Sequence, residues 1–119
     1  MRLLTLIVLA AASLAAADVS GKWRGTIQTE MAAQTDGQMP AYMELQQADG
    51  KITGNAGGSE KMLFKIREGS MEGDRLTVVA FPKEDSELRF ILTVKGDVLE
   101  GDVQENGRTI GVAKLTREK

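Results

Sequence analysis

The chain has 119 residues and a net charge of −2 at pH 7, and its basic and acidic residues are interspersed along its length rather than gathered in blocks. This length suits a single domain with one modest core, and the absence of a basic region argues against a nucleic-acid partner. The chain contains neither cysteine nor histidine, which excludes disulfides, the common nucleophile–histidine catalytic sites and the usual zinc and copper ligand sets.

The first 17 residues have the order of a cleavable secretory signal peptide. Arg2 supplies a positive charge, an apolar run follows from Leu3 to Ala10, and three alanines precede Asp18. The apolar run is shorter than the ~20 residues that a membrane-spanning helix needs. We therefore predict a signal-peptide helix over residues 1–17, an exported protein, and no integral membrane association after cleavage. An exported chain without disulfides suits a bacterial periplasmic or extracellular setting.

From Asp18 onward, apolar and polar residues alternate with the period of two that is typical of half-buried β-strands. Turn pairs such as Asp49-Gly50, Gly96-Asp97 and Asn106-Gly107 separate these runs, as expected for successive hairpins. The predicted strands are 20–29, 41–48, 51–56, 62–68, 75–81, 88–95, 98–104 and 108–116.

These strands predict one all-β domain over residues 18–119. An eight-stranded antiparallel up-and-down meander barrel is favoured, because closure leaves no exposed edge strand. A two-sheet β-sandwich is the alternative, since it satisfies the same alternation. We expect Gly57 to Glu60 to form a flexible connection and Glu30 to Pro40 to form the longest loop.

Two glycine-centred motifs resemble those of known barrels. Gly21-Lys22-Trp23 opens the first strand as a Gly-x-Trp motif, and Gly50-Lys51-Ile52-Thr53-Gly54 follows in a later hairpin. The motifs resemble those of lipocalin-like and avidin-like small β-barrels, and the Ser-Gly-Lys-Trp start resembles that of small exported bacterial proteins of largely unassigned function. The resemblance implies that Trp23 closes one barrel end. Biotin sites of avidin-like barrels use several aromatic walls, and this chain has too few aromatic residues for one.

The leading functional hypothesis is a non-catalytic barrel, not an enzyme, that binds a small, partly apolar ligand in or at the barrel mouth and uses no cofactor. Methionine adapts its shape, so Met31, Met39 and Met43 beside Tyr42 could form a soft lid there. The alternative is that Met43 is plain core and the other two methionines are incidental. The interior is expected to include Leu45 and Leu92. The candidate ligand-binding residues are Trp23, Met31, Met39, Tyr42, Met43, Phe64 and Phe90.

The second hypothesis is a protein-interaction module that acts on another exported protein. It is based on a resemblance to the small periplasmic barrels that inhibit secreted metalloproteases, and it would use the mature N-terminus, Asp18 to Ser20, together with the loop at 30–40. Interior volume separates the two hypotheses. A barrel without a pocket of about 300 Å³ favours the interaction module.

Acidic residues near the C-terminus are the remaining candidates for chemistry. Glu100 and Asp102 are two residues apart on one predicted strand, with Asp97 and Glu105 nearby, so a calcium site or an acid–base pair is conceivable. No calcium-loop spacing is present. We therefore favour a solvated strand face, with no catalytic residue and no metal.

Overall fold

The computed structural model describes residues 18–29 and 38–118. The predicted signal-peptide helix and Met31 lie outside these residues. The described chain forms eight strands, β1 (Gly21–Thr29), β2 (Gln38–Ala48), β3 (Lys51–Ser59), β4 (Met62–Glu72), β5 (Arg75–Lys83), β6 (Ser86–Lys95), β7 (Val98–Glu105) and β8 (Arg108–Arg117). These residues include no helix long and apolar enough to cross a membrane.

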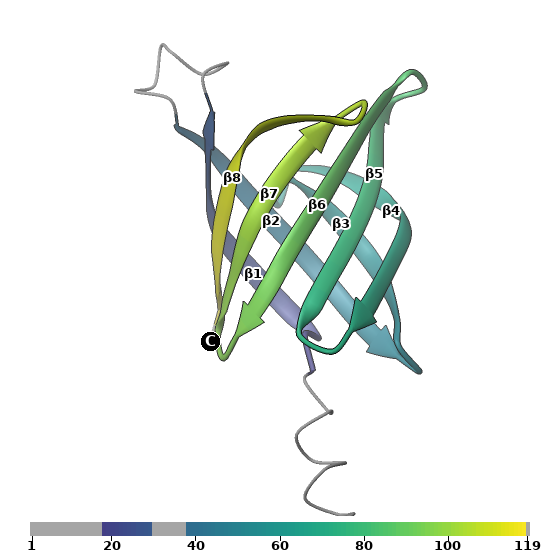
Figure 1. Ribbon diagram of the computed structural model, residues 1–119, viewed down its shortest axis with the longest axis vertical. Helices are drawn as coiled ribbons and strands as arrows, with labels where there is room; N and C mark the ends of the chain where they lie inside the picture. The colour runs from purple at the N-terminus through teal and green to yellow at the C-terminus, as the bar shows by residue number, and fades with distance from the viewer. Residues whose placement is uncertain (1–17, 30–37, 119) are drawn as a thin grey trace, which may run out of the picture.

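The strands close into a barrel (Figure 1). Each strand pairs antiparallel with the next one in the sequence, and β8 pairs with β1 through a register that joins Trp23 to Arg117 and Ile27 to Ala113. The predicted up-and-down barrel is therefore confirmed, and the sandwich alternative is wrong. Closure removes the two free edges that an open sheet of these strands would leave.

The two ends of the barrel are distinguished by their turns. At the end where β1 begins, which we call the closed end, lie the turns at Asp49-Gly50, Gly73-Asp74 and Gly96-Asp97. The opposite end, which we call the open end, holds the β3–β4, β5–β6 and β7–β8 turns. Asp49 and Asn106 adopt φ of 53° and 50°, and each precedes a glycine with positive φ. Asp-Gly and Asn-Gly pairs suit such two-residue hairpin turns, because both turn positions require positive φ.

Alternate residues of every strand face the barrel interior and form its core. The predicted interior residues Met43, Leu45, Phe90 and Leu92 are all buried. Phe64 packs less deeply than these four and remains partly exposed. The largest fully buried side chains are Trp23, Tyr42, Met43, Leu76, Leu92, Leu99 and Leu115.

Two predicted connections are shorter than the sequence suggested. Gly57 to Ser59 belong to β3 instead of a flexible linker, and β2 begins at Gln38, inside the expected 30–40 loop. A Cβ atom on Gly57 would lie 1.9 Å from the carbonyl oxygen of Met62. The glycine therefore lets β3 and β4 approach closely, which the linker interpretation overlooked.

Candidate ligand pocket at the open end

An apolar cavity of about 220 Å³ lies at the open end of the barrel. Its walls come from the first six strands and are almost entirely carbon. The lining residues are Ile27, Met39, Pro40, Ala56, Gly57, Gly58, Met62, Phe64, Ala80, Leu88 and Phe90. Such a surface favours an uncharged apolar group, because a buried charge there would find no partner.

Small side chains create this cavity. Ala56 and Ala80 are buried at inward positions of β3 and β5, where a leucine would otherwise fill the space. At Gly58, a Cβ atom would approach nothing closer than the carbonyl oxygen of Pro40, at 3.8 Å. These three residues therefore leave room that a larger side chain could occupy without backbone strain.

Two methionines form an exposed rim around the cavity. Met39 on β2 and Met62 at the start of β4 retain 41% and 63% of their accessible surface. Exposed thioether side chains are unbranched and polarizable, so they can adjust to ligands of different shape. Of the predicted lid residues that the structure describes, Met39 lies on this rim and Met43 and Tyr42 do not, whereas Met62 was not predicted.

The opposite end is sealed by Trp23. The indole is completely buried, and its Nε1–H donates a hydrogen bond of 2.9 Å to the carbonyl oxygen of Val19. The guanidinium carbon of Arg117 lies 4.4 Å from the centre of a Trp23 ring, a cation–π contact. Trp23 therefore stabilises the closed end and does not line the cavity at the open end.

The segment Asp18–Ser20 is fixed to the closed end. Val19 is fully buried, and its N–H donates to Oε1 of Gln47 at 2.9 Å. Arg117 donates to the carbonyl oxygens of Ser20 and Asp18 at 2.6 Å and 2.9 Å. The Ser20 N–H donates to the Asp18 carboxylate, which lowers the pKa of that carboxyl group below its usual value. These residues form part of the barrel plug and do not extend as an arm.

Tyr42 lies on the outer wall of the barrel, although it is fully buried. The Arg24 guanidinium covers the ring at 4.7 Å and pairs with Glu60 at 2.7 Å and Glu118 at 2.8 Å. Burial raises the pKa of the Tyr42 hydroxyl, and the carboxylates of Glu60, Glu44 and Glu118 raise it further. Tyr42 is therefore a structural residue of the wall, away from the mouth where a lid was predicted.

The structure thus brings together only part of the predicted site. Met39, Phe64 and Phe90 line the cavity at the open end. Met43 is core, and Trp23 and Tyr42 lie elsewhere. Sequence reasoning missed the residues whose small size creates the space, namely Ala56, Gly58 and Ala80, and also missed Ile27, Met62 and Leu88. The sequence signal that could have indicated the cavity is the occurrence of alanine and glycine at inward positions, where neighbouring strands carry larger apolar residues.

The acidic residues of β7 do not assemble into a metal site within the described chain. Oε1 of Glu100 lies 3.6 Å from Nζ of Lys95 on the neighbouring strand. No group of three or more carboxylates that could hold a metal ion occurs in residues 18–29 and 38–118. The exposed pair with Lys95 agrees with a solvated strand face.

Comparison with protein-family models, curated proteins and solved structures finds no match to this chain. The resemblance to lipocalin-like and avidin-like barrels therefore stays a prediction.

Proposed function

We propose that this protein is an exported, non-catalytic binding protein that holds a small apolar molecule, or the apolar end of a larger one, at the open end of its barrel. The observation that carries this proposal is the carbon-lined cavity of about 220 Å³ with its exposed methionine rim. The barrel supplies a rigid wall, and the apolar surface of the ligand supplies the driving force.

The cavity limits the size and the affinity of the ligand. Its volume of about 220 Å³ falls below the about 300 Å³ of a pocket for a drug-sized ligand, so volume alone favours the interaction module. The ligand proposal therefore rests on the apolar lining and applies to smaller molecules only. The cavity volume equals roughly the share of seven water molecules in the liquid, at about 30 Å³ each. Burial of ~150 Å² of ligand surface would contribute about 4 kcal/mol before the cost of association. We therefore expect dissociation constants no tighter than the millimolar range for a ligand that fills only this space.

The test is binding of a small naphthalene-type fluorescent probe to the protein and to two variants. Gly58→Ile places a branched side chain in the cavity, and Thr26→Ile adds the same side chain to the exposed outer face of β1. We expect about tenfold weaker binding to Gly58→Ile and unchanged binding to Thr26→Ile. The emission of the probe is the signal, because Trp23 lies at the other end of the barrel.

Two outcomes would contradict the proposal. One is that the wild-type protein does not bind the probe at millimolar concentration. The other is that Gly58→Ile, with an unchanged circular dichroism spectrum, binds it as well as the wild type does.

The interaction-module hypothesis loses one of its two contact elements. Val19 is fully buried beside Trp23, so Asp18 to Ser20 could reach a partner enzyme only after leaving the barrel end. The 30–40 loop lies mostly outside the described residues. No observation at these two elements favours an inhibitor over a ligand-binding barrel.

A further inference from the structure

Strands β4 and β5 separate from each other toward the open end. Their pairing runs from Glu72–Arg75 near the closed end to Ile66–Ala80, and no pair joins them beyond that point in the described chain. Residues 62–65 of β4 pair only with β3. The seam between β4 and β5 is therefore open toward the open end of the barrel.

Two local features cause the separation. Ile66 pairs with Ala80 but Glu68 pairs with Val79, so Arg67 is an extra residue on β4. Such a bulge bends its strand and disrupts the ladder. On β5, Phe81 and Pro82 lie opposite the single residue Glu87 of β6, which is a second bulge and bends β5 at the same level.

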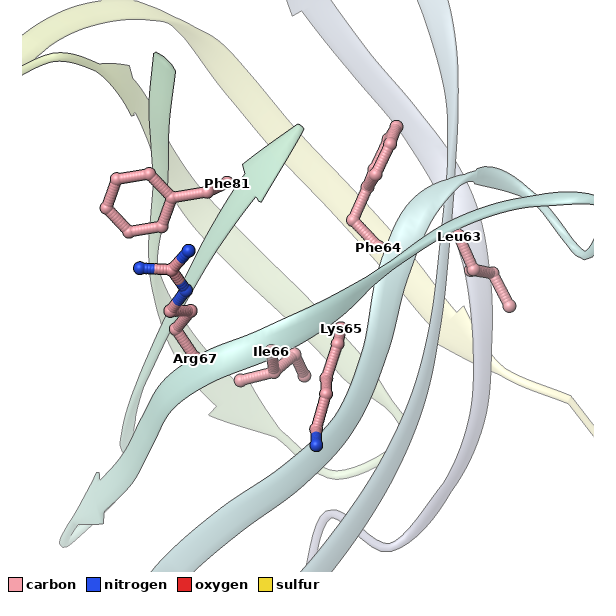
Figure 2. Close-up of a pocket in the computed structure, with 6 residues that line it drawn as sticks. All are labelled: Leu63, Phe64, Lys65, Ile66, Arg67 and Phe81. Carbon is pink, nitrogen blue, oxygen red and sulfur yellow. The ribbon is translucent and has the colours of Figure 1, made fainter. Parts of the chain in front are cut away.

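A cleft of about 560 Å³ occupies this gap. It is lined by Leu63, Phe64, Lys65, Ile66, Arg67 and Phe81, and the Phe81 side chain of β5 lies beside the Arg67 side chain of β4 (Figure 2). Because residues 62–65 have a strand on one side only, β4 presents an edge there within an otherwise closed barrel. Edges of this kind accept a further strand.

The charges of the cleft are basic. Lys65 and Arg67 are exposed, and neither takes part in an ion pair of the described residues. The Arg67 guanidinium instead lies 4.5 Å from the centre of the Phe81 ring. Carboxylates of a segment that lies along β4 could therefore pair with Lys65 and with Arg67 without displacing another carboxylate of the described residues.

We propose that the cleft between β4 and β5 binds an extended acidic segment of a partner protein, which adds as a strand to residues 62–65 of β4. Along β4, Leu63 and Lys65 alternate with Phe64 and Ile66, so the added strand has acidic side chains on the outer side and apolar ones on the inner side. The strand adds to β4 because residues 62–65 pair on one side only, with β3. A second copy of this edge is a poor occupant, because it would set Lys65 and Arg67 against the same cations.

The test uses labelled peptides of three Glu-Val repeats and of three Lys-Val repeats, with fluorescence anisotropy as the readout. We expect the acidic peptide to bind about tenfold more tightly than the basic one. The double variant Lys65→Glu/Arg67→Glu should lose about tenfold in affinity for the acidic peptide. Lys51→Glu/Lys114→Glu changes the net charge equally at exposed positions of β3 and β8, and should leave the affinity within about twofold.

Main-chain pairing is tested separately from charge. Two acidic peptides carry N-methyl groups on one or the other alternate set of residues, so that one of them cannot donate hydrogen bonds to β4. We expect that peptide to bind about tenfold more weakly than its counterpart. The proposal is overturned if the acidic peptide does not bind, if both methylated peptides bind like the parent, or if the control double variant loses as much affinity as Lys65→Glu/Arg67→Glu.

Discussion

The closed and open ends of the barrel follow the same backbone plan but differ in how much of their interior is filled. At the closed end, Trp23 and Val19 are fully buried and Arg117 covers the indole. At the open end, Ala56 and Ala80 occupy equivalent inward positions and leave a cavity. In a small barrel, side-chain volume decides whether the interior is core or binding space, because the strand number fixes the available width. The filled closed end stabilises the fold, and the open end provides the space in which we propose that a ligand binds.

The largest expected effect comes from removing the plug of the closed end. Trp23→Ala deletes a fully buried indole and its hydrogen bond to Val19, and should lower the free energy of unfolding by about 3–5 kcal/mol. Urea denaturation followed by far-ultraviolet circular dichroism measures this loss. The matched change at the rim is Met62→Ala. Its free energy of unfolding should stay within about 0.5 kcal/mol of the wild-type value, because Met62 is exposed. Equal losses would refute the division of roles between the two ends.

A smaller effect on stability distinguishes the packed core from the cavity at the open end. Ala113→Leu adds three carbon atoms where the core is fully packed, and should cost about 1–3 kcal/mol through overpacking. The same change in Ala80→Leu projects into the cavity, so we expect a cost below about 1 kcal/mol together with weaker probe binding. Thermal unfolding of both variants tests this pair. Should Ala80→Leu be the more destabilising, the cavity is not empty space in the folded protein.

The smallest effect concerns the outer wall and is confined to alkaline pH. The pKa of Tyr42 is raised in the folded protein, so folding favours the protonated hydroxyl. Its contribution to stability is constant while the unfolded chain also keeps the proton, and it falls as the pH rises above about 10. Tyr42→Phe should remove this part of the pH dependence, and Tyr42 is the only tyrosine in the chain. Unfolding free energies of both proteins from pH 8 upward provide the measurement, and parallel curves would contradict the expectation.

The sequence sufficed to place the strands and the core but not the cavity. Alternation and Asp-Gly or Asn-Gly turns are local signals, and they located every strand to within a few residues. The cavity depends on which inward residues of different strands meet at one level, which is a matter of register between strands. Ala56 and Ala80 lie on β3 and β5, and nothing in the sequence around either residue indicates that both line the same cavity.

The same reasoning explains the other misses. Tyr42 follows the alternation as an outward residue, and its burial depends on Arg24, which is distant in the sequence. The opening beside β4 depends on one extra residue, Arg67, which is identified only by the pairing with β5. The alternation of residues along one strand does not show how that strand pairs with its neighbours. The burial of Tyr42 and the opening beside β4 both depend on that pairing.

The pairing of β1 with β8 sets the order in which this molecule can be built. All other neighbouring strands are also consecutive in the sequence, whereas β1 must wait for the last strand to be made. Contacts between the two ends of a chain form slowly, since the whole loop between them has to be closed. Until then β1 presents an unpaired edge to other chains, and Trp23 lacks the cover that Arg117 later provides. Pairing of β8 with β1 is therefore the folding step that closes the barrel and removes the exposed edge of β1.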